Sequence, residues 1–151
     1  MASFEPKDPL FEARVRESFH RQEVMKSLGV EIAALRPGAI ELAMPYAPAF
    51  TQQHGFLHAG IVATALDSAC GYAAFSLMPT EASVLTVEFK INLLAPARGE
   101  HFLFKGNVVK PGRTITVCEG SAFAIEGGEE KLIATMTGTL MALFGRDGIS
   151  G

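Results

Sequence analysis

Apolar residues recur with two different periods along the chain, and each change of period marks a structural element. From about residue 8 to residue 28 they recur at roughly helical spacing and Gly29 follows them, which predicts an amphipathic helix. Residues 30–46 hold two short apolar runs on either side of Pro37 and Gly38, a strong turn signal. This part of the chain is therefore predicted to be a helix followed by a β-hairpin.

The segment from Ala59 to Phe75 is rich in alanine, almost wholly apolar and too long for a strand. It predicts a buried helix, and Pro79 ends the apolar run. Residues 83–94 alternate instead with the period of a strand. One face of this strand is expected to hold Leu85, Val87, Phe89, Ile91 and Leu93, and the other Thr86, Glu88, Lys90 and Asn92.

Three more strands are predicted at about 100–109, 114–125 and 131–144, joined by hairpin turns. The last is expected to carry one face of Leu132, Ala134, Met136, Leu140, Ala142 and Phe144, and another of Thr135, Thr137 and Thr139. This order predicts an α+β protein in which an antiparallel sheet of five or six strands wraps around one long central helix. With no repeat or linker, residues 1–151 are expected to form a single domain with a frayed tail at about 145–151.

Composition narrows the classes of function. The chain is 48% hydrophobic and 19% charged with a net charge of −3, which indicates a folded protein and favours neither nucleic acid nor an anionic membrane as partner. Cys70 and Cys118 lie in apolar surroundings without a CxxC spacing, which predicts buried free thiols and fits a reducing cytoplasm. The N-terminal residues lack the apolar core of a signal peptide, and the run from Ala59 to Pro79 is too interrupted for a membrane span.

Asp67 is the single charge within the apolar segment, and burying it without a partner would cost several kcal/mol. On a helix, its stripe would be shared by small or hydroxylated residues: Gly60, Thr64, Ser68 and Gly71. Two interpretations are open. The carboxylate reaches solvent or pairs with a lysine or arginine, or it faces a cleft or a subunit contact.

The loop before this segment favours the second interpretation. Its sequence QQHGFLHAG, residues 52–60, leads into a helix N-terminus, where free N–H groups and the helix dipole stabilise developing negative charge. Along a straight helix, Ala59 and Asp67 are about 12 Å apart, whereas one reacting carbonyl must lie about 3 Å from both groups. Either Asp67 is not catalytic, or a second copy of the helix runs antiparallel nearby, which predicts a two-fold dimer with two shared sites.

Residues Gln52, His58, Ala59, Gly60 and Asp67 form the pattern Q-x5-H-A-G-x6-D. With this motif and the strand LTVEFKINLLAPA, the chain resembles the hot-dog-fold acyl-CoA thioesterases from about residue 30 to residue 144, in particular the PaaI-like and 4-hydroxybenzoyl-CoA thioesterase branch. The resemblance implies a hot-dog fold, an acyl-CoA substrate, and homodimers that pair into a homotetramer. The family pattern has His-Gly-Gly where this chain has His-Ala-Gly, a change that keeps the N–H donor of Ala59 if its φ is negative.

The resemblance also implies roles for individual residues. Asp67 would act as general base or nucleophile, and the N–H of Ala59 would polarise the thioester carbonyl. Gln52 would position the carbonyl or the attacking water, and His58 would brace the loop. Thr86 matches a position where some relatives carry a hydroxyl near the carboxylate.

Other residues are candidates for substrate contacts, each with a structural alternative. Gly60 adjoins the expected donor, Phe56 lines an acyl pocket or packs in the core, and His54 contacts substrate or bonds to backbone. Arg113, in the turn KPGR, and Lys110 bind the phosphates of coenzyme A or are solvated surface charges. The chain has no metal-ligand spacing and no GxSxG, GxGxxG or Walker motif, so neither a metal nor a cofactor is predicted.

Three functions remain open. The first is an acyl-CoA thioesterase that hydrolyses small or medium acyl-CoA, aliphatic or aromatic, to free acid and CoA. The second is a hot-dog hydratase or dehydratase, for which His58 or His54 would have to serve as a base beside the carboxylate. The third is a non-catalytic acyl-CoA binding module, although such sensors typically carry an appended domain. The spacing of the motif favours the thioesterase.

Overall fold

The computed structural model describes residues 3–151, and its elements follow the predicted order. They are α1 (Phe11–Arg21), α2 (Glu23–Leu28), β1 (Glu31–Arg36), β2 (Ala39–Pro45), a 3₁₀ turn (Pro48–Phe50), α3 (Ala59–Phe75), β3 (Ala82–Leu93), β4 (His101–Lys110), β5 (Ile115–Glu126) and β6 (Glu129–Phe144). α3 has the predicted bounds. The predicted hairpin is also confirmed, since Gly38 takes a left-handed conformation with φ 79° between β1 and β2.

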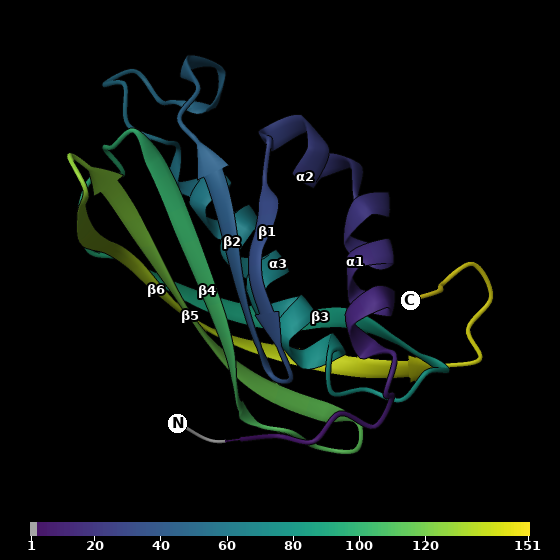
Figure 1. Cartoon of the computed structure of the whole chain (residues 1–151). Coiled ribbons are helices and arrows are strands. Elements are labelled where there is room, and N and C mark those ends of the chain that lie inside the picture. The colour runs from purple at the N-terminus through teal and green to yellow at the C-terminus, as the bar shows by residue number, and fades with distance from the viewer. Residues whose placement is uncertain (1–2) are drawn as a thin grey trace.

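The six strands form one antiparallel sheet in the order β1-β2-β4-β5-β6-β3. The sheet is strongly curved and wraps around α3, while α1 and α2 lie beside β1 (Figure 1). The predicted α+β architecture is therefore confirmed, with six strands around the long helix. β1 and β3 are the edge strands, so one edge of β3 is bonded to no other strand in residues 3–151.

α3 approaches the middle of the sheet closely, and the sheet has glycine at the points of approach. A Cβ at Gly106 of β4 would overlap the carbonyl oxygen of Ala69, and a Cβ at Gly120 of β5 would lie 3.1 Å from the Sγ of Cys70. The alanine-rich face of α3 that meets these glycines is fully buried. Small residues on both elements therefore allow the helix to sit inside the curve of the sheet.

The helix expected over residues 8–28 is divided in two at Gln22, whose backbone is extended with φ −81° and ψ 99°. The side-chain oxygen of Gln22 accepts a hydrogen bond of 2.9 Å from the hydroxyl of Ser68 in α3, which ties the break to the central helix. Apolar spacing does not reveal the break, because α1 and α2 both bury apolar residues in the same core.

Arg14 attaches α1 to the C-terminal end of α3. Its guanidinium donates to the carbonyl oxygens of Met78 at 2.6 Å and Phe75 at 3.2 Å, and it pairs with Asp8 at 2.9 Å. A cation at the carbonyl end of a helix is favoured by the helix dipole. This contact holds α1 alongside the C-terminal half of α3.

The predicted alternation of β3 is wrong at one point, where the strand contains a bulge. Its register against β6 shifts between Thr86 and Glu88, which leaves Val87 as an extra residue and reverses the faces beyond it. Thr86 pairs with the buried Leu140 and so lies on the α3 side of the sheet. Beyond the bulge the α3 side holds Phe89, Ile91 and Leu93, and the outer side holds Glu88, Lys90 and Asn92.

β6 departs from the prediction in a similar way near its start. It begins at Glu129, and its register against β5 shifts so that Ile133 is an extra residue. Ile133 is therefore buried, whereas Leu132, expected on the core face, is 40% exposed. Phe144 was expected on the same face and is instead exposed at the end of the strand. The alternation between these points is as predicted.

Cys70 and Cys118 are both buried and free, as predicted. Burial raises the pKa of both thiols, that of Cys118 to about 12. Neither thiol is therefore a ready nucleophile near neutral pH. Among residues 3–151, no helix has the length and apolar character needed to cross a membrane.

Candidate active site

Two side chains of the sequence motif hold the loop before α3. The carboxamide oxygen of Gln52 accepts hydrogen bonds from the backbone N–H groups of His54 at 2.6 Å and Phe56 at 3.3 Å. His58 is the N-cap of α3, and its Nδ1 accepts a hydrogen bond of 2.9 Å from the N–H of Gly60. His58 thus caps the start of the helix, and Gln52 holds the turn before it.

Ala59, the first residue of α3, carries a free backbone donor. Its N–H has no hydrogen-bond acceptor within residues 3–151, as is usual for the first turn of a helix. Its φ is negative, because every described residue with a positive φ is a glycine. The change from His-Gly-Gly to His-Ala-Gly therefore keeps the donor at the positive end of the helix dipole, where negative charge is stabilised.

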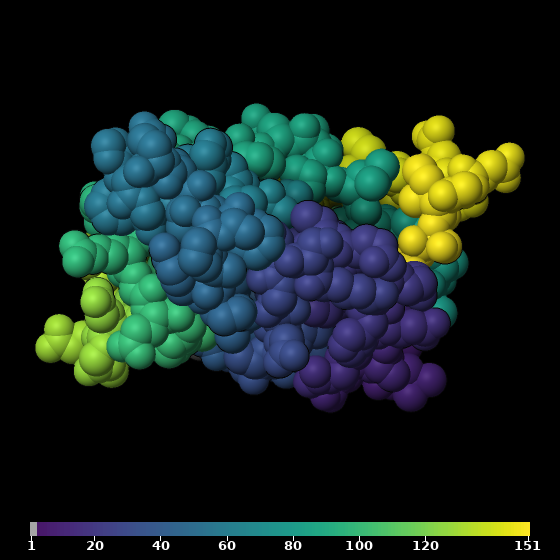
Figure 2. All heavy atoms as spheres, turned by 90° about the horizontal axis from the view of Figure 1, so that it is seen from above, coloured from purple at the N-terminus to yellow at the C-terminus, as the bar shows by residue number. Residues whose placement is uncertain are grey.

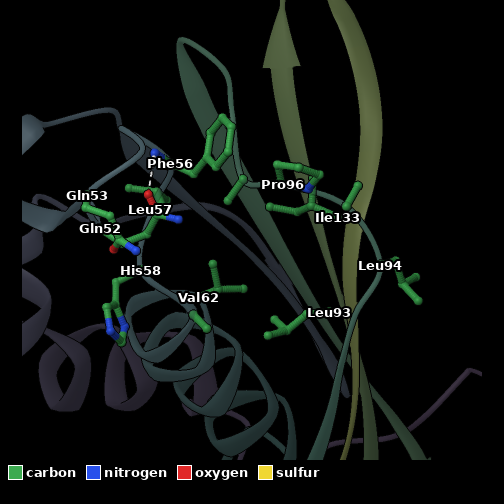
Figure 3. Close-up of a pocket in the computed structure, with 13 residues that line it drawn as sticks. Gln52, Gln53, Phe56, Leu57, His58, Val62, Leu93, Leu94, Pro96 and Ile133 are labelled. Atoms are coloured by element: carbon green, nitrogen blue, oxygen red, sulfur yellow. Dashed lines mark hydrogen bonds between the residues drawn. The ribbon is translucent and has the colours of Figure 1, made fainter.

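A cavity of about 520 Å³ opens beside this donor (Figure 3). It is lined by Gln52, Gln53, Phe56, Leu57, His58, Ala59, Val62, Leu93, Leu94, Ala95, Pro96, Ala97 and Ile133. In Figure 3 the side chains of Pro96, Ile133 and Leu93 form an apolar wall, and the ring of His58 points away from it. This loop cavity can therefore enclose part of a substrate next to the N–H of Ala59.

Asp67 lies two turns further along α3, in a different cavity. One of its carboxylate oxygens accepts a hydrogen bond of 2.8 Å from the hydroxyl of Thr86, so the expected neighbour is found beside it. No lysine or arginine in the described part of the chain forms an ion pair with this carboxylate. The interpretation that Asp67 pairs with a cation is therefore wrong.

The cavity around Asp67 has a volume of about 300 Å³ and is bounded by α1, α3, β3 and the C-terminal residues. Burial raises the pKa of the Asp67 carboxyl, and the hydrogen bond from Thr86 acts in the opposite direction. A carboxylate with a raised pKa is a better proton acceptor than one in water. Within residues 3–151, no group of acidic, histidine or cysteine side chains is arranged to hold a metal ion.

The two halves of the predicted site are apart in one chain. The loop residues of the motif share the larger cavity, with Gly60 exposed beside Ala59, whereas Asp67 and Thr86 line the smaller one. Eight residues of helix separate the halves by about 12 Å. Figure 2 shows the loop of residues 46–57 and the C-terminal residues at opposite ends of the molecule. A single chain therefore cannot bring both halves to one reacting group.

The other predicted contacts are dispersed. His54 is exposed in the loop, and its backbone N–H is bonded to Gln52. Arg113 lines a small cavity with Lys7, beyond the C-terminal end of α3, and Lys110 is exposed at the end of β4. Neither Arg113 nor Lys110 lines the cavities that hold the motif, so a role of these residues in binding phosphates stays a prediction.

The cavity of Asp67 also contains polar residues that the sequence did not single out. Ser18 of α1 lies 3.2 Å from the hydroxyl of Tyr72, and Gln22 holds Ser68. Ser18 and Gln22 are four residues apart, a spacing that would place them on one face of an uninterrupted helix, but polar pairs with this spacing are common on any exposed helix. Their position beside Asp67 follows from the packing of α1 on α3.

The sequence matches a known family. The model of the thioesterase superfamily matches residues 54–131, just over half of the chain. A protein of Saccharolobus solfataricus that is named as a candidate esterase is 34% identical over 106 residues, which are 70% of this chain and 75% of that protein.

Solved structures are similar to this protein over most of the chain. A thioesterase family protein from Silicibacter pomeroyi is 65% identical, and the match has a TM-score of 0.89 and covers 89% of this chain and 99% of that one. The PaaI protein from the phenylacetic acid degradation operon of E. coli is 18% identical, with a TM-score of 0.80 over 89% of this chain and 94% of its own. The second match is a likeness of fold alone.

Proposed function

Because the chain belongs to the thioesterase superfamily and is a thioester hydrolase, we propose that it hydrolyses an acyl-CoA to a free acid and CoA, at a site that combines Asp67 with the N-terminus of α3. The observation that carries this proposal is Asp67 itself. It is a carboxylate on an apolar helix, and within residues 3–151 its bonded partner is the hydroxyl of Thr86 rather than a cation. Such a carboxylate is suited to accept a proton.

In the proposed reaction, the N–H of Ala59 donates to the thioester carbonyl oxygen while a water attacks the carbonyl carbon and gives a proton to Asp67. The oxyanion that forms is held by the same N–H and by the helix dipole. The C–S bond then breaks, the thiolate of CoA leaves and takes the proton from Asp67, and the acid remains. Gln52 holds its loop through the carboxamide oxygen, which leaves its NH₂ group to position the water.

A homodimer is proposed to bring the two halves of the site together. β3 has a free edge, and four of its large apolar side chains are between 43% and 56% exposed: Leu85, Val87, Phe89 and Leu93. Antiparallel pairing of two β3 strands across a two-fold axis would continue the sheet and bring these side chains next to those of the partner strand. The two α3 helices would then run antiparallel, and Ala59 of one chain would approach Asp67 of the other.

A homotetramer and a cytoplasmic location belong to the same proposal. The resemblance to PaaI-like proteins implies that two such dimers pair into a homotetramer. The two free cysteines are consistent with a location in the cytoplasm. A hydratase or dehydratase that uses His58 as its base is disfavoured because the Nδ1 of His58 is bonded to Gly60 and its ring points away from the apolar wall of the loop cavity (Figure 3).

Thiol release from short, medium, long and aromatic acyl-CoA tests the proposed activity. Turnover of at least one class is expected, with kcat in the usual range of enzymes, roughly 1–1000 per second. The class with the highest kcat/KM identifies the acyl group. Binding of acyl-CoA without release of thiol from any of them would make the protein a binding module and overturn the proposal.

Thr86→Val is expected to move the acid limb of the profile of kcat/KM against pH to higher pH. The hydroxyl of Thr86 stabilises the ionised carboxylate, so its loss raises the pKa of Asp67 further. More of the enzyme then carries a protonated, inactive carboxyl at a given acidic pH. Thr86→Ser, which keeps the hydroxyl, is the matched control. An acid limb that is the same in all three proteins would contradict the proposed role of this bond.

Mixed dimers of Asp67→Asn and Ala59→Pro are expected to regain about a quarter of the activity of the wild type. At equal amounts, about half of the dimers hold one chain of each kind, and each of these has one complete site and one site with both defects. The two variants are unfolded and refolded together, and thiol release is compared with that of each variant refolded alone. A mixture no more active than its components would mean that the site is not shared between subunits.

A further inference from the structure

The last seven residues, 145–151, fold back over the cavity that holds Asp67. The segment leaves β6 after Phe144, and Gly145 and Gly148 both have positive φ, 62° and 76°, which turns the chain. Ser150 and Gly151 then line the Asp67 cavity together with residues from α1, α3 and β3. Figure 2 shows this segment, in yellow, at the end of the molecule away from the loop before α3.

Contacts at the end of the segment hold it against α3 and β3. The carbonyl oxygen of Ile149 accepts a hydrogen bond of 3.5 Å from the hydroxyl of Ser83. At Gly151, a Cβ would lie 2.7 Å from the Cζ of Phe75 and 3.0 Å from the carbonyl oxygen of Ala82. The backbone of Gly151 therefore packs directly on the last turn of α3 and on the first residue of β3.

The cavity extends along α3, from Asp67 towards the C-terminal segment. Thr86 of β3 and Asp67 of α3 meet at one end. Tyr72 of α3 and Val84 of β3 line the cavity further towards Phe75 and Ala82, on which Gly151 packs. The five helical residues from Asp67 to Tyr72 span about 7.5 Å. An acyl group whose carbonyl lies at Asp67 therefore has a path along α3 that ends at the C-terminal segment.

Beyond Asp67, the side chains that line this path are uncharged, and the polar ones outnumber the apolar ones. On the α1 side, the polar groups satisfy one another, since Ser18 is bonded to Tyr72 and Gln22 to Ser68. β3 adds the apolar side chains of Val84 and Leu85 to the lining, and Gly71 of α3 has no side chain to block the passage.

We propose that residues 145–151 form the end wall of the acyl cavity and set the length of the longest acyl group that the enzyme accepts. The proposal rests on the proposed function, in which the thioester carbonyl lies at Asp67. A path of about 7.5 Å holds an extended chain of roughly six carbon atoms. The loop cavity, which opens at the exposed Leu93 and Leu94, is left for the arm of coenzyme A.

Binding of S-alkyl-CoA thioethers, which cannot be hydrolysed, tests this wall without relying on turnover. Dissociation constants for butyl, hexyl, octyl, decyl and dodecyl thioethers are measured by calorimetry for the wild type and for a variant that ends at Phe144. In the wild type, affinity is expected to rise with chain length up to roughly six carbons and then to fall. In the shortened variant the dodecyl thioether is expected to bind at least about tenfold more tightly than to the wild type, the gain from burying two further methylene groups. Binding of the butyl thioether is expected to stay unchanged.

Two point variants test whether the position of residues 145–151 sets the length limit. One is expected to displace the segment, and the other is expected to leave it in place. Gly151→Val adds a side chain where Phe75 and Ala82 leave no room, so it is expected to displace the segment and shift the length limit in the same direction. Asp147→Ala changes an exposed residue of the same segment and is expected to leave the limit in place.

The possible results test the proposed end wall, formed by residues 145–151, separately from the proposed thioesterase activity. The same length limit in all four proteins, an equal loss of affinity at every length, or no binding of any thioether would each overturn the wall. A shifted length limit in a protein that releases no thiol from acyl-CoA would support the wall and contradict the proposed function.

Discussion

Asp67→Asn is expected to lower kcat for acyl-CoA hydrolysis by about a hundredfold or more, the usual scale for a lost general base. Asparagine has nearly the same shape and keeps an oxygen to accept the hydrogen bond from Thr86, so the change removes the proton acceptor and little else. Thiol release by the two proteins, on the acyl-CoA that the wild type hydrolyses best, measures the effect. Equal rates would mean that Asp67 has a structural role.

Asp67→Asn is also expected to change the free energy of unfolding. This quantity should rise at neutral pH, although kcat falls. Burial raises the pKa of Asp67 in the folded state above its unfolded value. The stability linked to this group is therefore fully present below the unfolded pKa and is lost as the pH rises through the folded pKa. Asparagine has no such loss, so Asp67→Asn is expected to have the higher free energy of unfolding at neutral pH, by at most about 1 kcal/mol after allowance for solvent screening. Urea unfolding at neutral and acidic pH measures the difference, which should vanish at low pH.

Ala59→Pro is expected to lower kcat by about 10²–10³, the cost of losing one oxyanion donor. Proline lacks the N–H that is proposed to hold the oxyanion, and the first position of a helix accepts proline because the N–H there has no partner within the helix. The preceding residue also permits it, since His58 has φ −60° and ψ 139°, the conformation favoured before proline. The variant thus removes the donor while leaving the helix start intact.

Two further measurements make this experiment specific. Ala59→Ser changes the side chain but keeps the N–H, and it is expected to retain most of the activity. The melting temperature of Ala59→Pro is expected to match that of the wild type. An Ala59→Pro protein that folds normally and is as active as Ala59→Ser would exclude this N–H as the oxyanion donor.

The parts of the fold that depend on neighbours in the chain can be predicted from the sequence. α3 begins and ends where its alanine-rich run does, and the β1–β2 turn lies at Gly38, because helix propensity and turn geometry are local properties. The pattern from Gln52 to Asp67 is local too, and so it carries the resemblance to thioesterases, which the match of the thioesterase superfamily to residues 54–131 confirms.

The bulge at Val87 depends instead on the pairing of β3 with β6. Strict alternation assigns Thr86 to the side away from the apolar residues that follow it, and one extra residue reverses that assignment. Thr86 therefore lies on the α3 side, where it donates its hydrogen bond to Asp67, although Phe89 beyond the bulge lies on that side too. The break at Gln22 likewise involves a distant contact, with Ser68, 46 residues away.

The sequence by itself therefore determined the order of elements, the long central helix, the motif of the site and the distance along the helix that separates Ala59 from Asp67. The tertiary structure decided which residues surround these groups. α1 and residues 145–151 meet at the Asp67 cavity although they come from opposite ends of the chain. Such neighbours are decided by packing and strand register, which depend on all elements at once, whereas propensity and spacing act over only a few residues.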